Sequence, residues 1–269
     1  RIERALLDPI RFDEQEIIPS ASFGVAIFPD DAASRESLIS NAGLAMHRAK
    51  GDPARTTCFY EPRMDEKIRA RRTLAADLHR AIDRNEFSLH YQVQVAVATG
   101  EIRGFEALLR WEHSQLGPIA PSEFIPLAEH DGLILPIGEW VLRTACADAA
   151  SWREPYKLTV NISTAQIAAP NLLEVIEVIL KTTGLPAARL ELELTESTLF
   201  SDETHARRTL HAIKNLGVGI SLGAFGTGNS SLYTLQSFPF DRIKIDRSFF
   251  SDSLSNPKTT AIIRAILAL

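Results

Sequence analysis

After residue 85 the chain alternates between strand-like and helix-like segments, and this alternation limits the possible folds more than any other feature. The strand candidates are 88–95, 104–111, 157–163, 189–197, 217–225 and 241–250. Helical patterns occupy 121–130, 137–153, 165–184, 203–216, 230–237 and 257–269. Repeated strand–helix units favour a parallel sheet covered by helices. Polar residues at the strand ends suggest the active-site edge of a (β/α) barrel, although the six predicted strands are fewer than the eight of a full barrel.

Residues 1–84 follow a different pattern. A strand is predicted at 20–28, a helix at 37–50 and a short strand at 57–60, followed by a long amphipathic helix at 62–85 that begins at a proline. We therefore predict three parts: an α/β segment at 1–61, a linker helix at 62–84 and a main domain at 85–269.

Charged and polar side chains interrupt the apolar strands of the main domain. Side chains two positions apart on a strand share a face, so Glu106, Leu108 and Arg110 point the same way. The other strands carry Asn161, the pair Glu191 and Glu193, and the pair Lys244 and Asp246. Any one of them could belong to a structural ion pair. Their occurrence on several strands of one sheet favours a functional site.

The charge distribution restricts the possible partners. Residues 1–84 carry equal numbers of basic and acidic side chains, so the formal net charge of −5 belongs to residues 85–269. Binding to duplex DNA needs a basic face, and this distribution argues against it. The acidic excess is either a solvated surface or a set of carboxylates gathered around metal ions.

The remaining composition predicts a cytoplasmic protein. Cys58 and Cys146 are the two cysteines, which indicates burial or a reducing compartment. No run reaches the roughly 18–20 apolar residues of a membrane span, and the first residues given do not have the pattern of a signal peptide. Because the sequence begins with Arg1, we expect a longer protein that could carry an upstream membrane or sensor region.

Seven motifs in order along residues 85–269 resemble the EAL-type cyclic di-GMP phosphodiesterases. They are YQVQ (91–94), EALLRW (106–111), FIPLAE (124–129), VNIS (160–163), ELTES (193–197), FGTGNSSL (225–232) and KIDRSF (244–249). Residues 1–61 resemble, less specifically, the C-terminal third of a GGDEF diguanylate cyclase domain, with Gly43 and His47 at two positions of its helix motif where the family has Asp and Tyr. The implied fold is an incomplete TIM-type (β/α) barrel of EAL type, preceded by a fragment of a GGDEF α/β domain.

The resemblance implies two-metal hydrolysis of a phosphodiester with Mg²⁺ or Mn²⁺. By motif match, Glu106, Asn161 and Glu193 are the metal ligands. Lys244 and Asp246 orient the attacking water and complete the site, and Glu196 anchors the glycine-rich loop 225–231. The expected substrate-binding residues are Gln92, Leu108 and Arg110, with the arginine fork on a phosphate.

The chain departs from the family pattern at the metal centre. The family has Asp-Asp before FGTG, whereas this chain has Gly223 and Ala224, whose side chains have no ligating atoms. Asn229 replaces an aromatic residue in the following loop. The family also continues beyond Leu269 into two more strands, one of which bears a further metal-ligating Glu. We therefore expect weakened metal binding and an EAL domain that lacks its last strands.

These observations leave three functions open. The first is a cyclic di-GMP receptor or impaired enzyme that passes a signal to a downstream protein, and it ranks above an active phosphodiesterase that makes the linear dinucleotide. A scaffold that no longer binds the nucleotide ranks third. By resemblance, the chain could also form a homodimer.

Overall fold

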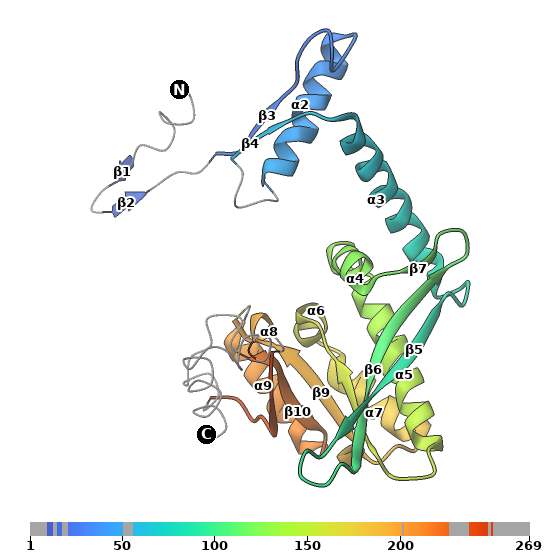
Figure 1. Ribbon diagram of the computed structural model, residues 1–269. Helices are drawn as coiled ribbons and strands as arrows, with labels where there is room; N and C mark the ends of the chain where they lie inside the picture. The colour runs from blue at the N-terminus through green and yellow to red at the C-terminus, as the bar shows by residue number, and fades with distance from the viewer. Residues whose placement is uncertain are drawn as a thin grey trace. The chain divides into compact units, whose positions relative to one another are not determined.

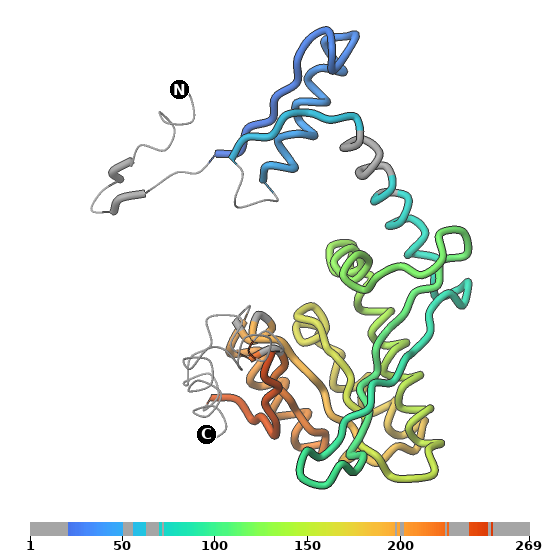
Figure 2. Tube along the Cα trace, viewed as in Figure 1, coloured from blue at the N-terminus to red at the C-terminus, as the bar shows by residue number. Residues whose placement is uncertain are grey.

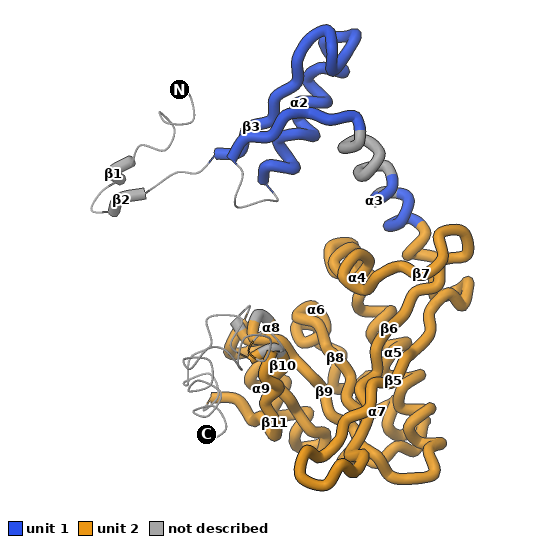
Figure 3. Tube along the Cα trace, in the orientation of Figure 1, with its two compact units in different colours: residues 1–76 blue, residues 77–269 orange. Residues whose placement is uncertain are grey.

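The computed structural model describes residues 10–12, 15–17, 21–50, 56–200, 202–225, 237–246 and 249 (Figure 1). The chain forms two compact units, residues 1–76 and residues 77–269 (Figure 3). The division into 1–61, 62–84 and 85–269 remains a prediction. The predicted helix at 257–269 and, apart from residue 237, the one at 230–237 lie outside the described residues.

The first unit contains small β-pairs and one well-formed helix. Strands β1 (Ile10–Phe12) and β2 (Gln15–Ile17) pair antiparallel, and β3 (Phe23–Val25) and β4 (Thr57–Phe59) pair parallel. Helix α2 (Arg35–Lys50) crosses β3 at Gly24, where a Cβ atom would collide with the helix backbone. Glycine at this position therefore permits the close contact. Helix α3 (Pro62–Ala81) contains the boundary between the two units.

A seven-stranded sheet forms the second unit, with the order β11-β10-β9-β8-β6-β5 and β7 paired to β6. The strands are β5 (Phe87–Val95), β6 (Ile102–His113), β7 (Gly117–Ile119), β8 (Lys157–Asn161), β9 (Leu190–Thr195), β10 (Gly219–Phe225) and β11 (Arg242–Ile245). Strands β6, β8, β9, β10 and β11 pair parallel, as the alternation predicts. The chain adds these strands in sequence order from one edge to the other (Figure 2).

Two features of the sheet were not predicted from the sequence: the antiparallel direction of the first strand, and β7. Strand β5 runs antiparallel to β6. Only residues 96–101 connect them, which is too short for the crossover that parallel neighbours require. Strand β7 pairs antiparallel with the end of β6.

Helices follow the parallel strands. They are α4 (Pro121–His130), α5 (Ile134–Ser151), α6 (Thr164–Ala168), α7 (Leu172–Thr183), α8 (Glu196–Phe200) and α9 (Glu203–Asn215), with a 3-10 turn at Ala187–Arg189. The single helix predicted at 165–184 is two helices, because Pro170 interrupts the helical hydrogen bonds between α6 and α7. The strand predicted at 189–197 ends at Thr195, and Glu196 begins α8.

The core lies between the sheet and these helices. Its buried strand residues include Leu158, Val160, Leu190, Leu192, Leu194, Ile220 and Leu222, and its buried helix residues include Ile137, Leu142, Ile176, Ile179, Leu210 and Ile213. At the start of β5, the indole Nε1 of Trp111 donates to Glu86 Oε2 over 3.0 Å. Burial opposes ionisation of Glu86, but hydrogen bonds from Trp111 and Ser114 outweigh it and lower its pKa. These hydrogen bonds of the Glu86 carboxylate hold the residue before β5 against the end of β6.

Candidate functional site

Four of the predicted site residues form one hydrogen-bonded cluster across the sheet. Lys244 Nζ donates to Glu106 Oε2 over 2.7 Å and to Glu193 Oε2 over 2.5 Å. Asn161 Nδ2 donates to Glu106 Oε1 over 2.9 Å. We call these four residues the ion cluster. The parallel register explains their meeting, because Asn161 lies directly beside Glu193 and the carboxyl ends of β6, β8, β9 and β11 share one edge.

In the ion cluster, burial and the opposite charges of neighbouring side chains shift the pKa values of Glu193 and Lys244. The side chain of Glu193 is 10% exposed and that of Lys244 is 31% exposed. Burial raises the pKa of Glu193, although Lys244 opposes this shift. Burial also disfavours the ammonium of Lys244, but hydrogen bonds to Glu106 and Glu193 outweigh it and raise the pKa of Lys244. The lysine is therefore held as a cation between two carboxylates.

Strand β10 contributes a glycine at the position where the resemblance described above predicts a carboxylate. A Cβ atom at Gly223 would lie 2.5 Å from Glu193 Oε1, 3.1 Å from its Cγ and 3.2 Å from its Cδ. The pairing of β10 with β11 shifts register between Leu222 and Phe225, which leaves one extra residue on β10. Such bulges re-aim side chains near functional sites. The shift in strand register thus includes Gly223 and Ala224, and Gly223 is the residue of β10 that lies against Glu193 of the ion cluster.

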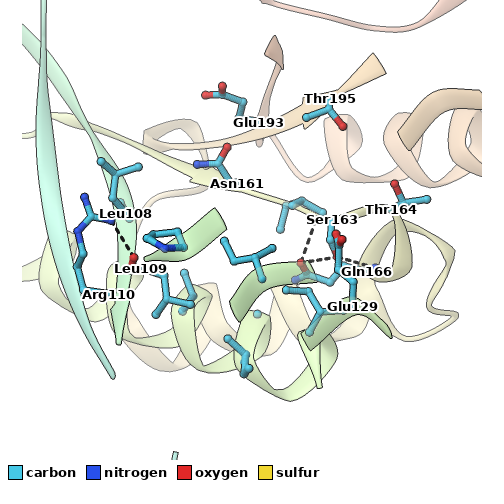
Figure 4. A pocket seen from close by; sticks show the side chains of 18 residues that line it. Leu108, Leu109, Arg110, Glu129, Asn161, Ser163, Thr164, Gln166, Glu193 and Thr195 are labelled. Atoms are coloured by element: carbon cyan, nitrogen blue, oxygen red, sulfur yellow. Dashed lines mark hydrogen bonds between the residues drawn. The ribbon is translucent and has the colours of Figure 1, made fainter. Parts of the chain in front are cut away.

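A cavity of about 520 Å³ opens beside the ion cluster (Figure 4). Asn161 and Glu193 belong to its wall, and Leu108 and Arg110 line it from β6. Arg110 Nη1 donates to the carbonyl oxygen of Leu109 over 2.9 Å, which fixes one end of its guanidinium. The sequence therefore placed Leu108 and Arg110 on the strand face that adjoins Glu106, and the structure brings both into the same cavity.

Several cavity residues were not identified from the sequence. They are Glu129, Ser163, Thr164, Gln166 and Thr195. Glu129 and Ser163 close the motifs FIPLAE and VNIS, and this position was the available signal. Ser163 caps α6: its backbone N and Oγ donate to Gln166 Oε1 over 3.0 and 3.1 Å, and Gln166 N donates back to Ser163 Oγ over 3.3 Å.

The other predicted residues, Gln92, Asp246 and Glu196, are not among the residues that line the cavity. Gln92 is exposed and directly opposite Glu106 in the β5–β6 pair. Asp246 directly follows β11, and Glu196 is buried at the start of α8. Most of the loop that Glu196 is expected to anchor, residues 226–231, lies outside the described residues.

Glu191 shares the strand face of Glu193 but belongs to a separate network. It is 1% exposed, accepts from Thr159 Oγ1 over 3.4 Å and lies 3.6 Å from Arg242 Nη1. Arg242 also donates to Gln94 Oε1 over 3.2 Å. Glu191 and Arg242 each precede a member of the ion cluster by two residues on the same strand, so the two networks lie next to each other along β9 and β11.

The donors do not fit a pair of divalent ions. Oxygen donors for a hard cation come from Glu106, Glu193 and the amide of Asn161. Both carboxylates already accept from Lys244, and Gly223 contributes no donor atom. Within the described part of the chain, no group of three or more Asp, Glu, His or Cys residues could hold a metal ion.

The sheet is mainly parallel, is covered by helices and carries polar side chains at its strand ends beside a cavity, which is the arrangement of a barrel-type α/β domain. Residues 75–269 match the EAL domain family, and the chain belongs to this family. Its fold is accordingly of the TIM-like barrel type, as the sequence predicted.

Relatives and solved structures agree with this assignment. An uncharacterized signaling protein of Caulobacter vibrioides is 48% identical over 269 residues, which are 100% of this chain and 33% of that protein. The bifunctional diguanylate cyclase/cyclic di-GMP phosphodiesterase MucR of Pseudomonas aeruginosa is 38% identical, covering 100% of this chain and 40% of MucR. A structure of the PaMucR phosphodiesterase in complex with cyclic di-GMP has a TM-score of 0.69 at 41% identity, covering 73% of this chain and 81% of that one.

The chain spans about a third of the length of the first curated relatives it matches. Among the described residues, no helix is both long and apolar enough to cross a membrane.

Proposed function

We propose that this chain is a cyclic di-GMP signalling module that binds the nucleotide in the cavity beside the ion cluster and hydrolyses it weakly or not at all. The observation that carries the proposal is the combination of a cavity lined by Leu108 and Arg110 with a glycine at position 223, where the metal centre needs a carboxylate. The complex of the related PaMucR phosphodiesterase with cyclic di-GMP supports the choice of ligand.

Nucleotide binding needs only residues that the chain retains. Arg110 offers a planar guanidinium to a phosphate, and Leu108 offers an apolar contact to a base. Gln92, opposite Glu106, supplies an amide at the edge of the site. Because none of these contacts requires a metal ion, we expect binding to persist in a chelator.

Hydrolysis needs more than the chain retains. Glu106, Asn161 and Glu193 are the proposed ligands of Mg²⁺ or Mn²⁺, which would activate a water and stabilise the charge on the phosphate. Lys244 and Asp246 are the proposed residues that orient the water, and Glu196 is the proposed anchor of the following loop. Loss of outer ligands alone costs roughly 10–100-fold in metal affinity. Replacing two carboxylates by Gly223 and Ala224 should cost more.

The alternative is an active phosphodiesterase, which the MucR relationship and the intact ion cluster favour. A scaffold without nucleotide binding is disfavoured by the retained Arg110 in an open cavity.

We propose further that residues 1–61 are the end of a GGDEF-like domain. The match of the whole chain to MucR, a bifunctional cyclase and phosphodiesterase, supports this. A cytoplasmic location, a homodimer and a downstream protein partner are part of the same proposal for a signalling protein.

Titration calorimetry with cyclic di-GMP, in EDTA and in Mg²⁺, tests the function together with chromatography of the products. We expect similar affinity in both buffers and little linear dinucleotide. Arg110→Ala removes a hydrogen bond to a charged group, worth about 1.5–3 kcal/mol, and should weaken binding about 10–150-fold. Arg110→Lys keeps the positive charge but loses the two-pronged guanidinium, so its affinity for cyclic di-GMP should lie between that of the wild type and that of Arg110→Ala. The absence of binding in either buffer, or fast turnover by the wild type, would refute the proposal.

A further inference from the structure

The last residue of β6 connects the turn that follows the strand to the helix that precedes the sheet. His113 is buried, with 2% of its side chain exposed. Its Nδ1 accepts hydrogen bonds from the backbone N–H groups of Gln115 and Leu116, each over 3.1 Å, and these bonds hold the turn between β6 and β7. Because Nδ1 accepts both bonds, the neutral imidazole carries its proton on Nε2.

The Nε2 atom of His113 faces helix α3. Asp77 Oδ2 lies 3.3 Å from it, and Asp77 Oδ1 lies 3.4 Å from Arg84 Nη1. The contact with Nε2 is electrostatic, because no aligned hydrogen bond to this atom is present among the described residues. Leu78 and Ala81 of the same helix are 1% and 0% exposed. The last turn of α3 is therefore packed into the second unit and brings a carboxylate to the end of β6.

The same strand presents the arginine of the cavity. Arg110 lies three residues before His113 on β6 and lines the cavity. Trp111 lies between them: it is 1% exposed, its ring centroid is 5.5 Å from that of His113, and it donates to Glu86. A close-packed segment of this kind transmits a displacement instead of absorbing it. The place of His113 therefore affects the place of Arg110.

We propose that His113 is a positioning residue for the nucleotide: held by Asp77 and by the β6–β7 turn, it fixes the end of the strand that presents Arg110. Neither His113 nor Asp77 lines the cavity, so both act on the ligand only through β6. The inference rests on the proposed function and extends it, because it makes the last turn of α3 part of the binding apparatus. Since α3 contains the boundary between the two units, a displacement of this helix would change the affinity for the nucleotide.

Titration calorimetry with cyclic di-GMP on the whole chain tests the proposal. Asp77→Asn keeps the shape of the side chain and removes its charge, and the affinity should fall about 3–10-fold, within the range for residues that act on a site from a distance. His113→Leu removes the contacts with both α3 and the turn and should cost more. His113→Asn places an acceptor near the position of Nδ1 and should recover part of the loss.

The matched control is Arg189→Met. Arg189 donates to the backbone carbonyls of Tyr156 over 3.0 Å and Ala149 over 2.8 Å, near the amino ends of β8 and β9 and outside the cavity lining. Its loss should lower the melting temperature without changing the affinity for cyclic di-GMP. A purely structural His113 would behave in the same way, so the comparison separates positioning from stability.

Hydrogen exchange measured by NMR supplies a readout that a structural role would not change. Because coupling between two sites is reciprocal, bound cyclic di-GMP should slow exchange of the Gln115 and Leu116 amides, although neither residue lines the cavity. In Asp77→Asn this slowing should be much smaller. In the nucleotide-free protein, Asp77→Asn should speed exchange of the same two amides, since His113 is then held less firmly.

Two results would overturn the inference: wild-type affinity in both Asp77→Asn and His113→Leu, or exchange at Gln115 and Leu116 that does not respond to bound nucleotide. If His113→Leu does not fold, the affinity of Asp77→Asn and the exchange measurements decide. Failure of the wild type to bind cyclic di-GMP would refute the proposed function and this inference with it, whereas loss of these responses in a chain that binds the nucleotide would refute the inference alone.

Discussion

Gly138 tests how the wall of the cavity is held in place. A methyl group added at Gly138 should lower the free energy of unfolding while Gln166 is present and raise it when Gln166 is replaced by alanine. Gly138 lies within α5 and is buried. A Cβ atom there would collide with the amide end of Gln166, lying 2.5 Å from Cδ and 2.9 Å from Oε1. Gln166 is 5% exposed and accepts two hydrogen bonds from Ser163. Gly138→Ala must therefore move a side chain that is fixed at its far end.

The magnitude follows from two opposing effects. Alanine in place of glycine in a helix stabilises by about 1 kcal/mol. Breaking the two hydrogen bonds to Gln166 Oε1 costs about 0.5–1.5 kcal/mol each. We expect Gly138→Ala to lower the free energy of unfolding by about 1 kcal/mol, which corresponds to about 2–4 °C in melting temperature. Affinity for cyclic di-GMP should fall as well, because Gly138, Ser163 and Gln166 all line the cavity.

A double-mutant cycle makes the prediction specific. In a Gln166→Ala background the obstacle is gone, so adding Gly138→Ala should now stabilise by about 1 kcal/mol. Gly43→Ala in α2 is the matched control for helix propensity, because a Cβ atom there would meet nothing within 4 Å. Urea unfolding followed by circular dichroism measures all variants. The reasoning is refuted if Gly138→Ala stabilises the otherwise unchanged protein as Gly43→Ala does.

Three further predictions follow from other parts of the structure. Gly223→Asp combined with Ala224→Asp should gain Mg²⁺- or Mn²⁺-dependent production of the linear dinucleotide, in a chain extended through the strands that the family has beyond residue 269. Chromatography of the products measures this gain, and the same chain with Glu106→Ala is the negative control. Equal turnover by the wild type would count against the proposed defect. The pKa of Glu86 is lower in the folded protein than in the unfolded chain. The ionised carboxylate should therefore stabilise the fold fully above its ordinary pKa of about 4.3, and this stabilisation should be lost as the pH falls through the lower pKa of the folded protein. Glu86→Gln should accordingly flatten the acid side of a plot of the urea midpoint against pH. Burial raises the pKa of Cys146 to about 12, so iodoacetamide at neutral pH should alkylate this thiol only after unfolding; mass spectrometry showing rapid labelling of the native protein would contradict its burial.

Much of the sheet was predictable because it depends on local patterns. The alternation of side chains along β6 predicted that Glu106, Leu108 and Arg110 share one face. In the structure, Leu108 and Arg110 line the cavity and Glu106 belongs to the ion cluster. Strand direction was predictable only where a helix separates two strands, so the sequence predicted strand β5 but not its antiparallel direction. The break between α6 and α7 was readable from Pro170 but was overlooked.

The details of the site depended on contacts that a linear pattern does not contain. The sequence assigned Lys244 to the attacking water, and no periodicity could show that its ammonium reaches both glutamates. The same holds for Gly138, whose role is visible only when Gln166 from another helix lies against it. At Gly223, which the sequence presents only as the loss of a ligand, and at Gly138, the side chain of another residue occupies the space that a Cβ atom would need.

The position of Lys244 in the chain also affects how the site is assembled. It lies 138 residues after Glu106 and 51 residues after Glu193. During synthesis from the N-terminus, the strands that bear both glutamates exist before the lysine that neutralises them. Docking of β11 onto β10 then relieves their repulsion, and contacts between such distant segments form slowly. A chain that ends before β11 should therefore form a sheet in which Glu106 and Glu193 lack the ammonium of Lys244, and such a truncated sheet should be less stable than the sheet that includes β11.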